Sequence, residues 1–360
     1  MYRLFTLVAI ALIAPAITLA ADTEPRHLRG ALLTAEMASS SRLSELRGQG
    51  YSAVVLALHG DSSAARAADK DAAQRVANAG LALWYWIEIG RNTQMADDHP
   101  QWMASLQGHL EWRRYFKDFA YPKAGEVVKN FPWVPILYQE TFDAHLARVK
   151  ELLSARPTAK GVLLNDLQGP PSACGCGNPV CRWTADYGPI KTATTLGDDV
   201  AARFVAAVEK LAGNGVVVVP VWTTECEAHD VAKDALCAGV GCFKGTCWKV
   251  YSRQLLPLAE QSQTIGALLL YKEFGQDGTP YSQPAGWVGH ALRGFQSMPP
   301  ANGGKAVEPQ RLLAVLQGWN VSPEELRSQQ AQAEAAGAAG WVVALAKIDQ
   351  SWSPRIVAAR

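Results

Sequence analysis

Eight short apolar segments alternate with segments of helical character along the chain, and this alternation restricts the fold more than any other feature. The apolar segments cover residues 30–34, 51–58, 81–89, 161–167, 216–223, 265–273, 312–317 and 341–347. Residues 216–223 read VVVVPVWT, a β-branched composition typical of strands buried on both faces. Strands that alternate with helices form parallel sheets covered by those helices. We therefore expect an α/β protein built on eight parallel strands.

Helix signals occur between these strands. Near the C-terminus, Ser322 is a suitable N-cap, Pro323 suits the first helical position and Glu325 completes a capping box before the helix ends at Gly337. Eight such repeats predict a (β/α)8 TIM barrel with long loops after the third, fourth and fifth strands. An open doubly wound sheet would show the same alternation, but no Gly-x-Gly-x-x-Gly motif follows the first strand. We expect residues 21–360 to form a single barrel domain.

The first twenty residues have the pattern of a secretory signal peptide. Arg3 precedes an apolar run, and small residues lead to a cleavage site after Ala20. An uncleaved membrane anchor is the alternative, against which Pro15 and the small residues argue. We expect residues 1–20 to be removed and the protein to be secreted or periplasmic, with no membrane contact after cleavage. The 34 Lys and Arg residues balance 33 Asp and Glu residues, so no strong field attracts nucleic acid.

All seven cysteines fall in two groups between positions 174 and 247: Cys174, Cys176 and Cys181, then Cys226, Cys237, Cys242 and Cys247. Disulfides are the expected state in an exported chain, and the odd number leaves at least one thiol over. We expect up to three disulfides, at least one of which joins the two groups. A zinc site made from the first group and one later cysteine is the alternative, but the spacing matches no common zinc module. We therefore expect neither a metal nor another cofactor.

Carboxylates, amides and indoles gather where the predicted strands end, which is the edge of a barrel that carries active sites. They are His59, Asp61, Trp84, Trp86, Glu88, Arg91, Asn165, Asp166, Trp222, Glu225, Tyr271, Lys272, Glu273, Gln317, Trp319, Lys347 and Asp349. Trp84, Trp86 and Glu88 alternate along one strand, so their side chains point to the same side of the sheet. Indole rings suit stacking on sugars. Any single tryptophan is more often barrel packing, but the set with Trp222 and Trp319 at neighbouring strand ends favours ligand contact.

Two carboxylates on adjacent strands are the arrangement that glycosidic bond cleavage requires, one as acid and one as nucleophile or base. Asp166 and Glu225 are the pair that we favour, with Glu273 and Glu88 as substitutes. Each carboxylate taken alone is more often a hydrogen-bonding or ion-pair residue than a catalyst. The residues that we expect to bind substrate are Trp84, Trp86, Glu88, Arg91, His99, Trp102, Asn165, Trp222, Lys272 and Trp319.

Two short motifs carry a family resemblance. His99-Pro100-x-Trp102 follows the third strand, and Asn165-Asp166 ends the fourth. With the signal peptide and the barrel pattern, they resemble secreted glycoside hydrolases of the alpha-galactosidase type and their relatives. That resemblance implies that Asp166 is the nucleophile. In that group the acid/base is an Asp after the sixth strand, whereas this chain has Lys272-Glu273 there.

Other mechanisms fit the residues less well. The beta-galactosidase-type clan requires Asn-Glu at the fourth strand and a Glu at the seventh, where this chain has Asn165-Asp166 and Gln317. A metal-dependent hydrolase is disfavoured because none of the seven histidines forms a His-x-His pair. We predict hydrolysis of an oligo- or polysaccharide, with carbohydrate as the partner. A barrel that binds carbohydrate without cutting it is the alternative, because of the mismatch at Lys272-Glu273.

Overall fold

The computed structural model describes most of the strand and helix framework. The described residues are 27–58, 60, 62–90, 92–99, 102, 127–129, 134–136, 138–165, 167, 199–223, 258, 260–262, 264–270, 288–289, 291–293, 296, 307–348 and 357–359.

Eight parallel strands close into a barrel in the order β1-β2-β3-β5-β6-β7-β8-β9. Their bounds are β1 Leu28–Leu33, β2 Ala53–Ala57, β3 Ala82–Glu88, β5 Gly161–Asn165, β6 Val217–Thr223, β7 Ile265–Leu269, β8 Leu312–Gln317 and β9 Gly340–Ala344. Each falls within a predicted strand or extends it by one or two residues, and the closed sheet confirms the (β/α)8 prediction over the open alternative. A separate antiparallel pair joins β4 Val127–Lys129 to β10 Val357–Ala359.

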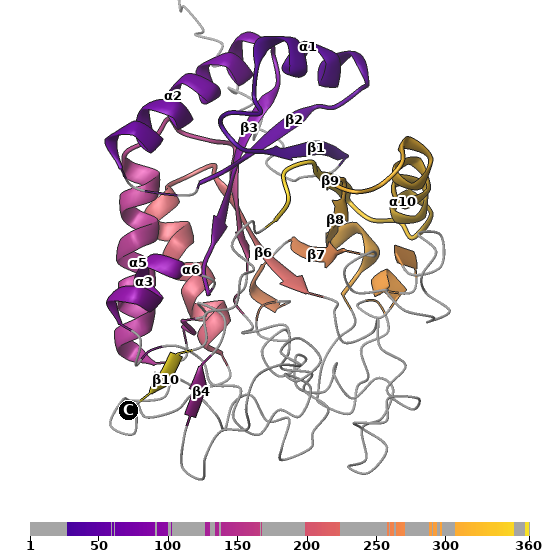
Figure 1. The fold of residues 1–360 in the computed structure, drawn as a ribbon. Helices are drawn as coiled ribbons and strands as arrows, with labels where there is room; N and C mark the ends of the chain where they lie inside the picture. The colour runs from indigo at the N-terminus through magenta and orange to yellow at the C-terminus, as the bar shows by residue number, and fades with distance from the viewer. Residues whose placement is uncertain are drawn as a thin grey trace, which may run out of the picture.

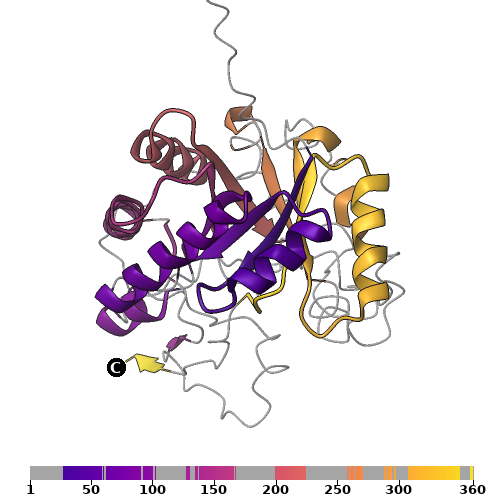
Figure 2. The ribbon, with the colours of Figure 1, turned by 90° about the horizontal axis from the view of Figure 1, so that it is seen from above.

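Helices connect the strands and lie outside them (Figures 1 and 2). Their bounds are α1 Ser40–Gly48, α2 Ser63–Asn78, α3 Thr93–Asp98, α5 Gln139–Ser154, α6 Val200–Ala212, the 3-10 helix η6 Pro309–Arg311 and α10 Pro323–Ala335. The predicted N-terminal signal of α10 is confirmed, because Ser322 and Glu325 form a reciprocal capping box. Residues 258, 260–261, 288–289, 291–293 and 296 are also helical.

The register of the strands separates a lumen face from a helix face. Tyr85 of β3 donates from its hydroxyl to the carbonyl of Pro157 at 2.8 Å, and Trp341 of β9 donates from Nε1 to Glu334 of α10 at 3.3 Å. Those side chains therefore lie on the helix side of the sheet. Since side chains alternate along a strand, Trp84, Trp86 and Glu88 point into the lumen.

Glycines make room for the large lumen side chains. Gly161 of β5 pairs with Trp84 of β3, and a Cβ added at Gly161 would lie 2.2 Å from the Trp84 ring. The indole thus occupies the space that any other residue at position 161 would fill. Trp84 and Trp86 are both buried, at 4% and 2% exposure, and form the floor beneath the carboxyl end of the barrel.

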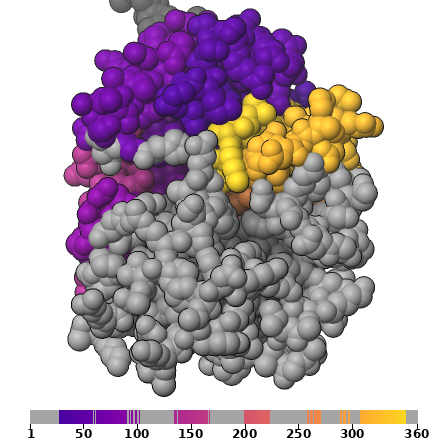
Figure 3. Space-filling model, viewed as in Figure 1, coloured from indigo at the N-terminus to yellow at the C-terminus, as the bar shows by residue number. Residues whose placement is uncertain are grey.

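The two ends of the described barrel meet in space. β1 pairs in parallel with β9, with Gly30 opposite Val342 and Leu32 opposite Ala344. In Figure 3 the N-terminal residues, coloured indigo, accordingly adjoin the C-terminal residues, coloured yellow and orange. Among the described residues, no helix has the length and apolar character that crossing a membrane requires.

Candidate functional site

Glu88 is the best defined polar group at the carboxyl end of the barrel. It is the last residue of β3, and both of its carboxylate oxygens accept hydrogen bonds. Nε1 of Trp86 donates to Oε1 at 2.7 Å, and Nδ2 of Asn165 donates to Oε2 at 3.0 Å. Asn165 is opposite Glu88 in the register of β3 and β5, so both side chains point into the lumen. The structure thus brings together three predicted site residues.

These contacts fix the orientation of the group. An indole nitrogen can only donate, so the Glu88 oxygen that faces it acts as an acceptor. The other oxygen accepts from the NH2 group of Asn165, so the orientation of that amide is fixed as well.

The backbone around Glu88 is also held. Arg148 of α5 donates from a guanidinium nitrogen to the carbonyl of Glu88 at 2.9 Å, and the amide of Ile89 donates to the carbonyl of Asn165 at 3.0 Å. The ends of β3 and β5 are therefore tied to each other and to a helix. A carboxylate on such a rigid frame keeps its geometry when a ligand arrives.

An aromatic pair follows β3. His99 and Trp102 stack with ring centroids 3.9 Å apart and an interplanar angle of 23°. Both follow α3, which is capped by the side-chain oxygen of the buried Asn92. Trp102 also packs against a small apolar cluster formed by Met95 and Val134. The predicted binding residues His99 and Trp102 thus form one flat unit in the connection after β3.

Gln317 lies across the barrel from Glu88, because β8 is four strands from β3 in the closed order. Its side chain is fully buried and donates to the carbonyl of Trp319 at 3.2 Å. The amide side chain of Gln329 on α10 bonds both the backbone N–H and the carbonyl of Gln317. Trp319, 9% exposed, is thereby attached to the end of β8.

Trp222 is not brought to this group. It shares its parity with Val218 on β6, and the register puts it opposite Ala267 on the helix side of the sheet. It is fully buried. Trp222 therefore packs between strand and helices, away from the lumen where Trp86 and Glu88 lie.

Several predicted site residues lie outside the described residues. They are Arg91, Asp166, Glu225, Lys272, Glu273 and the seven cysteines. The signal peptide lies outside them as well. Among the described residues, no three His, Cys, Asp or Glu side chains are arranged to hold a metal ion.

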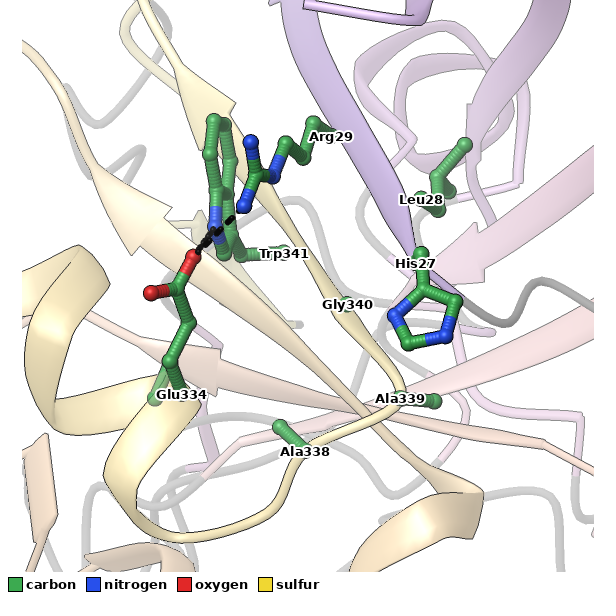
Figure 4. Close-up of a pocket in the computed structure, with 9 residues that line it drawn as sticks. His27, Leu28, Arg29, Glu334, Ala338, Ala339, Gly340 and Trp341 are labelled. Atoms are coloured by element: carbon green, nitrogen blue, oxygen red, sulfur yellow. Dashed lines mark hydrogen bonds and ion pairs between the residues drawn. The ribbon is translucent and has the colours of Figure 1, made fainter.

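A pocket of about 220 Å³ lies at the opposite, amino-terminal end of the barrel. It is lined by the start of β1, the end of α10 and the start of β9 (Figure 4). Arg29 and Trp341 both reach the same carboxylate oxygen of Glu334, each at 3.3 Å. Arg29 and Glu334 are about half exposed, so their ion pair is a solvent-exposed contact between β1 and α10 and not a buried binding site.

Three polar residues that were not predicted hold backbone behind the mouth: His145, Arg148 and Arg156. They recur at near-helical spacing on and just after α5, beside the buried Val149 and Leu152. Polar side chains within an otherwise apolar helix stripe were the signal that could have revealed them.

Fold and site together define a (β/α)8 barrel whose mouth carries an oriented carboxylate. No family model and no curated protein matches the sequence. Solved structures that are similar include a GH5_18 protein from Bifidobacterium longum subsp. longum, 12% identical with a TM-score of 0.46, covering 88% of this chain and 69% of that chain. A glycoside hydrolase family 20 beta-N-acetylglucosaminidase is 13% identical with a TM-score of 0.44, and the match covers 88% of this chain and 70% of that chain. An HpcH/HpaI aldolase from Desulfitobacterium hafniense is 10% identical with a TM-score of 0.38, covering 89% and 86%.

Proposed function

We propose that the protein hydrolyses glycosidic bonds in an oligo- or polysaccharide at the carboxyl end of the barrel. The observation that carries the proposal is the Glu88 carboxylate, held at the mouth by Trp86 and Asn165. Asn165 directly precedes Asp166, one member of the proposed carboxylate pair, in the sequence. A carboxylate beside an amide suits sugars, because hydroxyl groups donate hydrogen bonds to such oxygens.

The proposed reaction uses Asp166 and Glu225 as the carboxylate pair. One carboxyl group protonates the leaving oxygen, and the other attacks the anomeric carbon or activates a water molecule. Glu88 binds a sugar hydroxyl, and Glu273 and Glu88 are the substitutes if a member of the pair is dispensable. The stacked pair of His99 and Trp102 offers an aromatic surface to a sugar ring.

The proposal includes export and disulfide formation, both of which rest on the sequence alone. Signal peptide 1–20 directs the chain to a secreted or periplasmic location, where cysteines 174–181 and 226–247 form up to three disulfides. Mass mapping of the unreduced protein tests this part. Seven alkylatable thiols, or zinc released by acid in stoichiometric amount, would contradict it.

A panel of aryl glycosides and of plant and microbial polysaccharides tests the activity. We expect turnover of at least one member, and we expect Asp166→Asn to lower kcat by about 10²–10⁴-fold. Glu45→Gln, which alters an exposed carboxylate of α1, is the matched control and should retain full activity. The proposal fails if no sugar is cut and none raises the melting temperature. Binding that survives both Asp166→Asn and Glu225→Gln, without turnover, would instead identify a non-catalytic carbohydrate-binding barrel.

A further inference from the structure

One face of α5 and the residues that follow it carry a row of polar side chains that end on backbone carbonyls. The row consists of His145, Arg148 and Arg156, which we call the α5 polar row. His145 and Arg156 are buried, and Arg148 is part-buried. Apolar side chains would be the ordinary choice on the buried face of a helix. Their replacement by three polar groups needs a physical reason.

Arg148 acts at the end of β3. Its guanidinium donates to the carbonyl of Glu88 at 2.9 Å, from the helix side of the sheet. The Glu88 side chain points the other way, into the lumen, where Trp86 and Asn165 hold it. Glu88 is thus fixed on both sides, by its carbonyl and by its carboxylate.

His145 acts one step further along the chain. Its Nε2 lies 2.8 Å from the carbonyl of Val134, and the amide of Val134 donates to the carbonyl of Gly90 at 2.7 Å. A carbonyl can only accept, so Nε2 carries the proton. His145 therefore holds the position of Gly90, two residues after Glu88, through Val134.

Arg156 acts at the end of β2. It donates to the carbonyl of Gly60 at 2.6 Å and to the carbonyl of Leu152 at 3.1 Å. Its charge is paired with Asp69 of α2, 2.7 Å away, and the Arg156 side chain is completely buried. The three members of the row thus reach backbone at or beyond the carboxyl ends of two adjacent strands, β2 and β3.

Burying such groups adds little net stability. The desolvation cost of a buried charge is large. A protein in which apolar residues of similar volume replace a buried ion pair is therefore often as stable as the parent. What the polar row supplies instead is position, since each side chain holds a specified carbonyl. A displacement of about 1 Å near a reacting group can cost about 100-fold in rate, so a helix that fixes these ends has a direct use.

We propose that His145, Arg148 and Arg156 are positioning residues that set where the ends of β2 and β3 lie, and thereby hold the Glu88 carboxylate against Asn165. The consequence for catalysis rests on the proposed function of the mouth. The positioning itself does not, because the hydrogen bond from Trp86 to Glu88 reports it in the absence of any substrate.

Arg148→Met tests the row by removing the donor while keeping an apolar stem of similar reach. The indole N–H signal of Trp86 is followed by ¹H–¹⁵N NMR and assigned with Trp86→Phe. In the parent this signal should be shifted downfield by the bonded carboxylate and should move when Glu88 is protonated. In Arg148→Met we expect it to move upfield and to lose most of that response. Arg148→Lys, which keeps a donor, should restore much of the parent signal.

Arg203→Met is the matched control, because Arg203 lies on α6 in an exposed pair with Asp199. It should leave the Trp86 signal unchanged. If Arg148→Met does not fold, Arg148→Gln decides by the same readout, since its amide is too short to reach the carbonyl. A parental Trp86 signal in a folded Met or Gln variant overturns the inference.

Kinetics then separate the two proposals. With an active substrate, we expect Arg148→Met to lower kcat by about 10-fold to 100-fold with little change in KM, and Arg148→Lys to recover part of it. If the parent cuts no sugar but the Trp86 signal responds as expected, the proposed function fails and the positioning inference stands. If sugars are cut and Arg148→Met leaves both kcat and the signal unchanged, the inference fails and the function stands.

Discussion

At the scale of single residues, the packing of the lumen depends on the close contact between the Trp84 ring and Gly161. The Trp84 ring lies where a Cβ at position 161 would be, and Trp84 in turn lies beneath Trp86, which bonds Glu88. A change at Gly161 therefore acts on the floor of the proposed site. It also tests whether the buried indoles are packing or ligand surface.

We predict that Gly161→Ala destabilises the protein by about 1–3 kcal/mol, because the methyl group overpacks the lumen against a ring that has no free space. Urea unfolding would measure this as a lower midpoint. Combining it with Trp84→Phe should cost less than the sum of the two single changes, since the smaller ring leaves room. Gly48→Ala is the control: its methyl group meets no atom within 4 Å, and it should be neutral or slightly stabilising. Equal effects at both positions would contradict the packing.

His145 makes stability depend on pH. Burial lowers the pKa of its imidazole from 6.5 to about 3, the carbonyl of Val134 opposes that shift and Arg148 adds to it. The folded pKa lies below the unfolded one, so the unfolded state binds the proton first on acidification. This contribution to stability is complete above about pH 6.5 and is lost progressively as the pH falls towards 3.

We predict that His145→Gln reduces the acid sensitivity of folding. Glutamine keeps an N–H donor for Val134 but takes up no proton, so up to roughly 5 kcal/mol of pH-dependent stability between pH 6.5 and 3 should disappear. Melting temperatures measured from pH 7 to pH 4 give the slope for parent and variant. Identical slopes would show that His145 is not buried in its neutral form.

At the scale of elements, the eight strands could be predicted because each is a compact apolar run between turn residues, and the capping box marked α10. The mouth was only partly predictable. Parity along β3 correctly related Trp86 to Glu88, but Trp222 was assigned to the mouth from its place at a strand end. Trp222 pairs with Ala267 in the strand register, so its side chain points to the helix side of the sheet. Gln329 could not be foreseen, because its role depends on how α10 packs beside β8.

Ion pairs between elements should differ sharply in how much they contribute to the free energy of unfolding. Arg156 and Asp69 join the residues just after α5 to α2 with side chains that are 0% and 7% exposed, whereas Arg29 and Glu334 join β1 to α10 with both side chains about half exposed. We predict that Asp69→Ala costs about 3–5 kcal/mol, because it leaves the buried Arg156 charge without its carboxylate. Arg29→Ala, which breaks the exposed pair and leaves Glu334 to accept from Trp341, should cost at most about 1 kcal/mol. Thermal unfolding of the two variants compares them directly, and a similar loss in both would refute the distinction.

At the scale of the whole molecule, the fold depends on one seam where the first barrel strand meets the last. Gly340 at the start of β9 approaches β1 so closely that a Cβ would lie 2.4 Å from the carbonyl oxygen and 2.7 Å from the amide nitrogen of Leu28. Backbone atoms cannot move aside as a side chain can. The seam therefore requires glycine at this position, and strands distant in sequence depend on each other through it.

We predict that Gly340→Ala opens the barrel at this seam before it unfolds the rest. Amides of β1 and β9 that bond across the seam should exchange with solvent much faster in native-state hydrogen exchange, while those of β5 and β6 keep most of their protection. Gly266→Ala is the comparison: its Cβ would lie 2.8 Å from Cγ2 of Val221, which rotation about the Cα–Cβ bond of the valine can move, and 3.3 Å from the backbone Cα of Val221, so its effect should be smaller and centred on β6 and β7. Uniform loss of protection in Gly340→Ala would mean that the barrel opens only as a single cooperative unit, and that the seam has no separate weakness.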